Sequence, residues 1–267
     1  MKARILPGIF LLVGASALAG TSAKPLSFVA CPILQDTETV PCWLADYEGE
    51  RYYLTIQIDS AAEVYPPELG HRALIEGTPT DERVCGGKVL KDIKISVLPE
   101  RDENCNTMLP PVPEYTVPFA PRGPGPREKL EVLRAKGLRP PAGARPPEPE
   151  KPKRPYQEKE FTVYYQFDWQ IATRDTRTMT QAMQYAKDIN ASRVEITGYR
   201  ATALLSNGEE LVEKDFLPRR RALVLAETLA KIGVPKSTIK TVWIDEPQRG
   251  SGVEDWKLRK ATIRVIP

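Results

Sequence analysis

The chain has 267 residues with 38 basic and 35 acidic side chains, and its formal net charge of +3 argues against a dedicated nucleic-acid-binding protein. The length allows one or two domains, and 26 prolines against 17 glycines mark a globular but proline-rich composition. The small net charge hides an asymmetry. Residues 24–108 carry 8 basic and 15 acidic side chains, a net of −7, whereas residues 109–267 carry 28 and 20, a net of +8. Opposite signs favour two modules with different partners, or modules that attract each other.

The N-terminus has the pattern of a secretory signal peptide. Lys2 and Arg4 precede a mostly apolar stretch that is too short to span a bilayer, and small residues follow up to Ala23. An uncleaved N-terminal helix is the alternative interpretation. We predict a signal peptide over residues 1–23 that is cleaved, and a mature protein without a transmembrane segment that is exported to the periplasm.

The cysteines agree with an exported protein. All four lie in the acidic half, as Cys31, Cys42, Cys85 and Cys105. An even number favours two disulfides in an oxidising compartment, and of the three pairings loop locality favours Cys31–Cys42 with Cys85–Cys105. Their spacing contains no CxxC, and His71 is the single histidine of the sequence, so we expect no metal site.

Residues 24–108 are predicted to form a small all-β domain. The strand candidates are "TVPCWLAD", "RYYLTIQID", "HRALIEGT" and "KDIKISVL", separated by turn signals. Four or five short strands with disulfides favour a barrel or a sandwich, with an OB-like barrel as one option. The acidic charge disfavours a phosphate backbone as ligand. We interpret this domain as a structural or partner-binding module whose ligand the sequence does not identify.

Residues 109–157 are predicted to be a linker. They hold fourteen of the prolines and too few apolar residues for a core. Such composition predicts an extended, semi-rigid spacer. Within it, "PREKLEVLRAKGL" has the pattern of a short amphipathic helix.

Residues 158–267 predict a compact α/β domain. "FTVYYQFD", "RVEITGY", "IKTVWI" and "KATIRVI" are strand candidates. One helix is expected around Met179 to Ile189, with Thr173 as N-cap and Asp175 in its first turn, and a second from the arginine run to Gly233. The order β-α-β-α-β-β predicts two helices packed on one mixed sheet.

In this last segment the residues resemble a known family. "VYYQFD", "EITGY", "LPRRRALVLAETLAKIGVPKSTI", "DEPQ" and "RKATIRV" follow the motif order of the OmpA-like peptidoglycan-binding domain. The resemblance covers about 110 residues and leaves the N-terminal domain unrecognised. It implies a wall-binding domain that hangs on a spacer in the envelope of a bacterium with an outer membrane, which fits the predicted signal and linker.

The resemblance also implies a ligand site. Members of the family hold the zwitterionic diaminopimelate side chain of the wall peptide with an aspartate and an arginine. The family arginine falls on Arg221, whereas the aspartate falls on Ala201 and the histidine of the family motif on Tyr199. With Arg220 and Arg200 beside them, these positions predict a receptor for a carboxylate or another anion, supported by the positive end of a helix.

A hairpin is expected between the two motifs, because Asn207-Gly208 is a strong hairpin signal. It could cover the site or supply a substitute carboxylate, for which the candidates are Glu209, Glu210, Glu213 and Asp215. The simpler interpretation, which we prefer from sequence, makes these acids solvated surface, with Asp215 capping the following helix.

The sequence favours a non-enzymatic protein, since it lacks a catalytic triad order, a nucleophile elbow, a P-loop and metal-ligand spacing. We expect no cofactor and no nucleic-acid partner. The leading hypothesis is a periplasmic cell-envelope protein, associated with the outer membrane or the wall, that docks on peptidoglycan or an acidic protein through Arg221. The alternative is a degenerate OmpA-like scaffold for protein–protein assembly that has lost diaminopimelate binding with Ala201.

Overall fold

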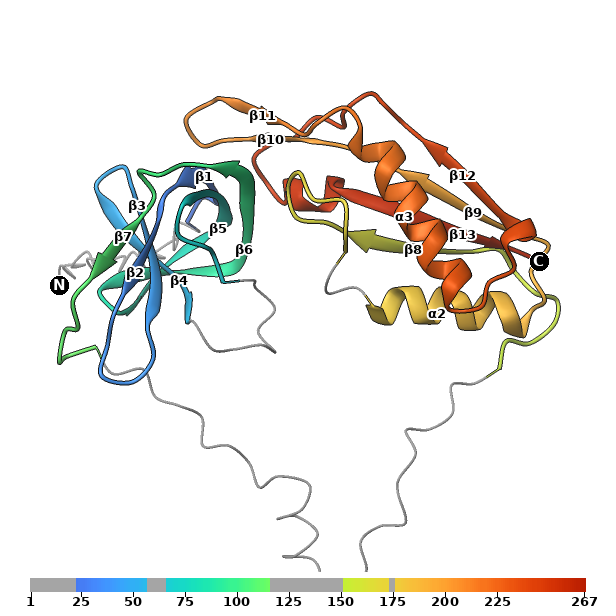
Figure 1. The fold of residues 1–267 in the computed structure, drawn as a ribbon, viewed down its shortest axis with the longest axis horizontal. Helices are drawn as coiled ribbons and strands as arrows, with labels where there is room; N and C mark the ends of the chain where they lie inside the picture. The colour runs from blue at the N-terminus through green and yellow to red at the C-terminus, as the bar shows by residue number, and fades with distance from the viewer. Residues whose placement is uncertain (1–22, 57–65, 116–150, 173–175) are drawn as a thin grey trace, which may run out of the picture.

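The structure, a computed structural model, describes residues 23–56, 66–115, 151–172 and 176–267 (Figure 1). We call residues 23–115 the first part and residues 151–267 the second part. The predicted signal peptide, most of the predicted linker with its helix, and the expected cap at Thr173 and Asp175 lie outside the described residues. The chain is mostly β, with two α-helices and two disulfides among the residues described. None of the described helices has the length and apolar content that a membrane span requires.

The first part is one seven-stranded sheet with the order β1-β5-β6-β4-β3-β2-β7. Its strands are β1 Leu26–Ala30, β2 Pro32–Gln35, β3 Cys42–Tyr47, β4 Glu50–Ile56, β5 His71–Val84, β6 Gly87–Arg101 and β7 Thr107–Leu109. The prediction of four or five short strands was too low in number, because it missed β1, β2 and β7, and it was wrong in length for β5 and β6, which form one hairpin of 14 and 15 residues. A closed barrel is not confirmed: the described pairings run from β1 at one end to β7 at the other.

The disulfide pairing expected from loop locality is wrong. Cys31 is bonded to Cys105, and Cys42 to Cys85, across 74 and 43 residues of sequence. The cause is the strand order, since β2 pairs in parallel with β7 and thereby brings the two ends of the first part together. Both bonds therefore join segments that are distant in sequence, and neither closes a local loop.

The second part has the predicted order of elements. Its strands are β8 Lys159–Tyr164, β9 Arg193–Gly198, β12 Ile239–Trp243 and β13 Lys260–Ile266, and its helices are α2 Thr176–Asp188 and α3 Leu217–Lys231. The sheet order is β12-β9-β13-β8, with β12 and β9 parallel and the other pairs antiparallel. Both helices lie over one face of this sheet, and the short 3-10 helices η1 Lys236–Thr238 and η2 Asp255–Leu258 complete the part (Figure 1).

The core of the second part follows the apolar periodicity of the sequence. The inward positions of the strands, among them Val163, Ile196 and Ile263, are fully buried against the apolar face of α3, which includes Leu225 and Leu229. Burial of such side chains is worth roughly 1.5–3 kcal/mol each, so this face accounts for the position of α3.

The start of α3 packs closely on the end of β9. A Cβ added at Gly198 would lie 1.9 Å from the carbonyl oxygen of Pro218. Since no side chain fits there, a glycine at the end of β9 is what lets the arginine-bearing first turn of α3 approach the sheet. This contact sets the position of Arg221 relative to the residues that follow β9.

The hairpin predicted at Asn207-Gly208 is present. Strands β10 Thr202–Leu204 and β11 Glu210–Val212 pair antiparallel, and Gly208 has a φ of 90° at the turn. Asp255, 2% exposed, holds strand β10 near the turn by accepting a hydrogen bond from the Leu204 N–H at 2.9 Å. The hairpin extends towards β1 and β5 of the first part (Figure 1).

The two parts share a buried apolar cluster. Leu74 and Leu98 of the first part pack with Phe167, Ala203 and Leu205 of the second. Paired hydrogen bonds join Ser27 and Ser206, one from the Ser27 N–H to the Ser206 hydroxyl at 2.9 Å and one from the Ser206 N–H to the Ser27 carbonyl at 2.7 Å. The described residues of the two parts therefore form a common interface.

Candidate functional site

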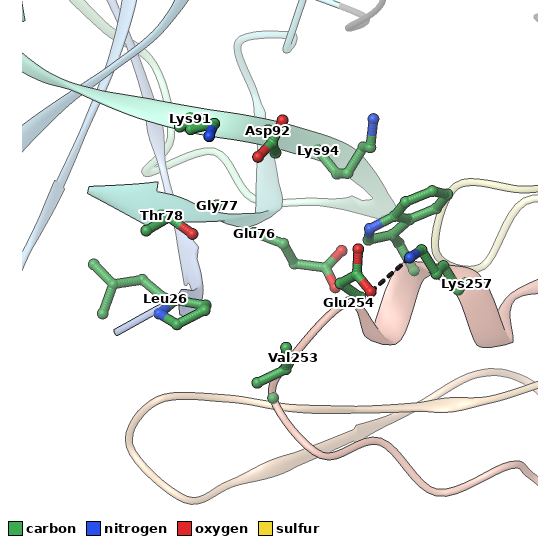
Figure 2. A pocket seen from close by; sticks show the side chains of 13 residues that line it. Leu26, Glu76, Gly77, Thr78, Lys91, Asp92, Lys94, Val253, Glu254 and Lys257 are labelled. Atoms are coloured by element: carbon green, nitrogen blue, oxygen red, sulfur yellow. Dashed lines mark hydrogen bonds and ion pairs between the residues drawn. The ribbon is translucent and has the colours of Figure 1, made fainter. Parts of the chain in front are cut away.

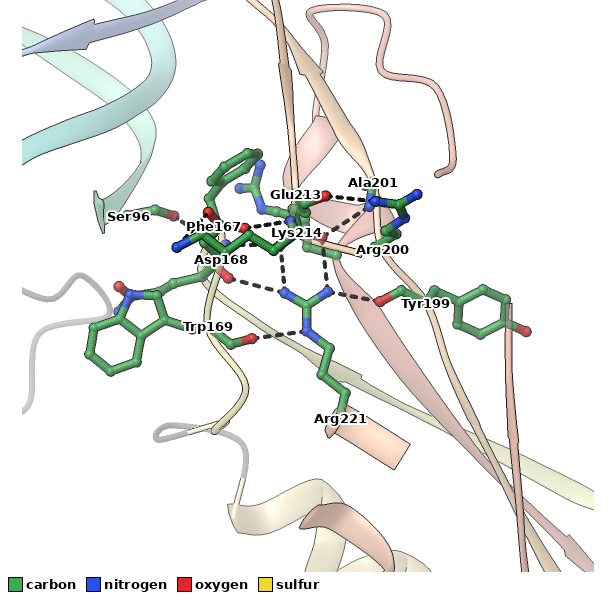
Figure 3. Close-up of polar contacts among 12 residues, drawn as sticks. Ser96, Phe167, Asp168, Trp169, Tyr199, Arg200, Ala201, Glu213, Lys214 and Arg221 are labelled. Atoms are coloured by element: carbon green, nitrogen blue, oxygen red, sulfur yellow. Dashed lines mark hydrogen bonds and ion pairs between the residues drawn. The ribbon is translucent and has the colours of Figure 1, made fainter. Parts of the chain in front are cut away.

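Arg221, the residue predicted to receive an external anion, is fully buried. It is the fifth residue of α3, with 0% of its surface exposed. Its Nη2 donates to Glu213 Oε1 at 2.5 Å and its Nη1 to Glu213 Oε2 at 2.9 Å, which is the two-pronged geometry of a guanidinium–carboxylate pair (Figure 3). The anion that Arg221 meets is therefore a side chain of the same chain.

Backbone carbonyls take the remaining donors of this guanidinium. Nε donates to the Trp169 carbonyl at 2.9 Å, Nη1 to the Tyr199 carbonyl at 2.8 Å, and Nη2 to the Gln166 carbonyl at 3.4 Å. The five N–H groups of an arginine are thereby matched by five hydrogen bonds. The guanidinium also lies 4.7 Å from the centre of the Tyr165 ring, a distance at which a cation is attracted to an aromatic face.

Glu213 is equally enclosed. It is 1% exposed, and its carboxylate accepts the Asp168 N–H at 3.0 Å and the Ala201 N–H at 2.9 Å besides the two bonds from Arg221. The interpretation of the hairpin acids as solvated surface is wrong for Glu213. It remains right for Glu209 and Glu210, which are exposed. Ala201 contributes to this site only through its backbone N–H.

Asp215 does not cap α3. The residue before the helix is Phe216, no side chain forms a capping bond there, and Asp215 is exposed. The first turn contains no acidic residue, and Pro218 occupies one of its first two positions. The partial positive charge of this helix end is therefore not balanced by a local acid.

The other predicted site residues surround the Arg221–Glu213 pair without opening it. Arg200 Nε donates to the Asp245 carbonyl at 2.6 Å and its Nη1 to the Glu213 carbonyl at 3.0 Å, so Arg200 fastens the chain behind the pair. Tyr199 takes part through its carbonyl. Arg220 is exposed and donates to Gln170 Oε1 at 2.9 Å. Of the four residues, Arg221, Arg200 and Tyr199 are brought together around Glu213, and Arg220 lies outside.

The segment Gln166–Trp169 was not singled out by the sequence analysis as part of the site. It supplies two carbonyls to Arg221, and it also contacts the first part. The Phe167 N–H donates to the Ser96 hydroxyl at 2.9 Å (Figure 3). The indole N–H of Trp169 donates to the Val97 carbonyl at 3.0 Å. One segment thus joins the Arg221 pair to strand β6.

Asp168, inside that segment, is a buried carboxyl with a φ of 59°. Its side chain is 7% exposed, and its Oδ1 accepts the Lys214 N–H at 2.9 Å. Burial raises the pKa of Asp168 above its ordinary value, and the neighbouring Glu213 and Glu100 add to that rise, while the Lys214 N–H and charge act against it. The negative charge of Asp168 is therefore only partly compensated by its neighbours.

A second charged pair is buried between the two parts. Arg259, at the end of η2 and 1% exposed, forms an ion pair with Glu76 of β5, which is 7% exposed. Only the two terminal nitrogens of Arg259 reach Glu76, and Nε has no hydrogen-bond partner among the described residues.

A cavity of about 440 Å³ lies beside this pair, between β5, β6 and the segment before η2 (Figure 2). Its charged lining residues are Glu76, Asp92, Glu254, Lys91, Lys94 and Lys257. Three carboxylates and three ammonium groups balance in number, and Lys257 is already paired with Glu254 at 2.5 Å. Trp256 lies between Lys94 and Lys257, with ring distances of 4.8 and 5.5 Å. The lining charges are thus largely compensated within the protein.

No family model matches the chain, and no curated protein matches it. Among solved structures, the OmpA-like domain of FopA1 from Francisella tularensis subsp. tularensis SCHU S4 is similar over 41% of this chain and 73% of that chain, with 17% identity and a TM-score of 0.33. At this level the likeness carries no argument about the site, so the family resemblance depends on the motif order of the sequence.

Proposed function

We propose that this chain is a non-enzymatic cell-envelope protein whose second part is an OmpA-like scaffold for protein–protein assembly and does not hold diaminopimelate through Arg221. The observation that carries the proposal is the complete enclosure of Arg221 by Glu213 and three backbone carbonyls. An external carboxylate would have to displace Glu213. Separating a buried ion pair in this way costs about 3–5 kcal/mol, which a single new carboxylate contact does not recover.

The assembly role is supported by what the second part already does. It binds the first part through an apolar cluster, the Ser27–Ser206 hydrogen bonds and the buried Arg259–Glu76 pair. Interfaces with an apolar centre and polar links around it are typical of protein–protein contacts. The first part is thus the first protein surface that this scaffold holds.

Location in the periplasm, after export by a cleaved signal peptide and near the outer membrane or the wall, is part of the same proposal. The signal-like N-terminus supports it. The two disulfides support it as well, because such bonds persist in oxidising compartments.

Sedimentation with isolated cell-wall sacculi tests the proposal on the full chain. We expect that any sedimentation at physiological salt is unaffected by an excess of free meso-diaminopimelate, because the pocket of Arg221 is filled. The competition is repeated with Asp168→Asn, so that an effect at Arg221 can be told from one at the nearby carboxylate. Competition that persists in this variant would overturn the proposal.

Docking on peptidoglycan through Arg221 is the second candidate function. It is favoured by one observation, the two-pronged carboxylate geometry at Arg221, which is what an external carboxylate would need. Under this candidate Glu213 would occupy the place of the ligand and leave it on binding. Competition by diaminopimelate in the experiment above is the result it requires.

A further inference from the structure

A small groove lies beside the start of α3, next to the interface of the two parts. Its volume is about 260 Å³, and it is lined by Pro99, Asp168, Trp169, Gln170, Ile171, Lys214, Phe216 and Leu217. Pro99 belongs to β6 of the first part, and the other lining residues belong to the second part. The groove is therefore continuous with the contact by which the second part already binds a protein surface.

The sides of this groove are apolar and exposed. Ile171 is 51% exposed and Phe216 52% exposed, although both are large apolar side chains and both line the groove. Trp169 is fixed in orientation by the hydrogen bond from its indole to the Val97 carbonyl. Exposed apolar side chains gathered around a hollow are typical of a contact site.

The groove also contains a carboxylate with an open acceptor. Asp168 Oδ1 is used by the Lys214 N–H, but Oδ2 accepts no hydrogen bond from the described residues. Its nearest cation there is Lys214 Nζ at 4.0 Å (Figure 3). That ammonium is held by Glu100 at 2.5 Å. Asp168 thus lines the groove with a side chain that is 93% removed from solvent, and no cation lies closer to its Oδ2 than Lys214 Nζ among the described residues.

The electrostatics around Asp168 favour a cation over an anion. The groups that face it are Glu213, Glu100 and Lys214, and the raised pKa shows that the carboxylates and burial outweigh the lysine. An added cation would relieve this imbalance, whereas an added anion would increase it. Aromatic walls favour the same choice, because ring faces attract cations.

We propose that this groove binds a lysine side chain of a partner protein, with the ammonium at Asp168 Oδ2 and the methylene stem along Phe216 and Ile171. The inference rests on the proposed assembly function and names the chemistry of the partner. Lysine fits better than arginine because a two-pronged guanidinium contact needs both carboxylate oxygens, whereas Oδ1 of Asp168 already accepts the Lys214 N–H and a compact ammonium can bind to Oδ2 alone. The apolar sides suit the four-carbon stem.

The direct test titrates the full chain with three peptides: acetyl-Gly-Lys-Gly-amide, its norleucine analogue without the ammonium, and its arginine analogue. Binding is followed by NMR through the indole N–H signal of Trp169, which is assigned with Trp169→Phe. We expect saturable shifts with the lysine peptide and weaker binding of the other two. Equal binding of the norleucine peptide would show that the charge plays no part and would overturn the proposal.

Variants locate the contact. Asp168→Asn keeps the shape and the Oδ1 acceptor, and asparagine tolerates a positive φ, so the fold should persist. It should weaken the lysine peptide about tenfold, since a hydrogen bond between charged groups is lost. Its matched control is Asp215→Asn, an exposed carboxyl outside the groove, which should leave the affinity unchanged. Equal affinities of the two variants would contradict the assignment of Asp168.

The apolar side of the groove and the pH dependence of binding are tested separately. Affinity should fall as the pH is lowered through the raised pKa of Asp168, because protonation removes the charge, and this pH dependence should vanish in Asp168→Asn. Phe216→Ala should also weaken binding, with Leu223→Ala, exposed on α3 but outside the groove, as its control. If the lysine peptide does not bind, the result of the sacculus sedimentation is unaffected. If diaminopimelate competes in the sacculus sedimentation, the result of the peptide titration is unaffected. The two proposals can therefore fail independently.

Discussion

Two arginine–glutamate pairs are buried in this molecule, and they differ in how completely they are satisfied. Arg221 and Glu213 lie eight residues apart in sequence, are 0% and 1% exposed, and use all of their donors and acceptors. Arg259 and Glu76 lie 183 residues apart, join the two parts, and leave Arg259 Nε without a partner among the described residues.

The difference indicates two roles. A fully satisfied pair within one part fixes the hairpin and the helix start in a single arrangement, because any change leaves a buried charge behind. A pair that spans an interface beside a cavity of about 440 Å³ can exchange its partner for water more easily. We therefore expect Arg221–Glu213 to be a permanent element of the fold and Arg259–Glu76 to determine how firmly the parts are held together.

The largest effect is expected for Glu213→Ala. The substitution leaves the Arg221 charge buried and removes the acceptor of the Asp168 and Ala201 N–H groups, which should lower the free energy of unfolding by about 3–5 kcal/mol. Urea unfolding followed by circular dichroism measures this. Glu210→Ala, an exposed acid of the same hairpin, is the control and should change stability by no more than about 0.5 kcal/mol. Equal losses of unfolding free energy in the two variants would contradict the prediction that the buried pair matters more than a surface acid.

Arg259→Met should have a smaller effect on unfolding and a specific effect on the interface. Glu76 then loses its partner but can be hydrated through the cavity, so we expect a loss of about 1–3 kcal/mol. A protease site inserted within residues 116–150 allows the chain to be cut, and gel filtration then shows whether the parts stay together. We expect wild type to remain associated and Arg259→Met to dissociate more readily.

The control for that variant is Arg264→Met. Arg264 lies on β13 and pairs with Glu195 at 3.0 Å, but its side chain is 40% exposed and does not face the first part. Cut chains that carry this substitution should co-elute as wild type does. Dissociation of both variants to the same extent would mean that general destabilisation, and not the interfacial pair, separates the parts.

The sequence was sufficient for the elements with a clear apolar period. Strands β8, β9, β12 and β13 and both helices were expected where they occur, because alternation and helical spacing are local properties of the chain. The hairpin at Asn207-Gly208 was expected for a similar reason, since the turn residues define its geometry. Strands β1, β2 and β7 were missed because they are short, with three to five residues each.

Contacts between residues that are far apart in sequence could not be predicted in this way. The pairing of Cys31 with Cys105 depends on the parallel contact of β2 and β7, and no spacing rule encodes such a contact. Glu76 looks like any acid on a strand until Arg259 is placed against it. Glu213 was named as a substitute carboxylate for the arginine site, but the preference for solvated surface acids outweighed it. An arginine at a helix start without its usual acidic partner was the available signal that a nearby carboxylate would be buried.

Asp168→Asn should produce a change of opposite sign from the two buried-pair variants. The pKa of Asp168 is raised in the folded chain, so the folded state binds the proton more tightly than the unfolded state does. The contribution of the protonated carboxyl is present at low pH and is lost as the pH rises through the folded pKa. Asp168→Asn should therefore be more stable than wild type at neutral pH, and the difference should shrink on acidification. Thermal unfolding across pH measures it, and a destabilised variant at neutral pH would contradict the assignment.

The smallest effect is expected for the exposed pair that also crosses the interface. Lys214 and Glu100 approach to 2.5 Å, but their side chains are 40% and 60% exposed, so solvent screens their attraction. Lys214 lowers the pKa of Glu100, so what stability the pair adds is present above the unfolded pKa of Glu100 and is lost as the pH falls through the folded value. Glu100→Gln should cost less than about 1 kcal/mol and should leave cut chains associated. Separation of the cut parts by Glu100→Gln, to the extent expected for Arg259→Met, would contradict this prediction. Burial would then not be what decides which charge pair holds the interface.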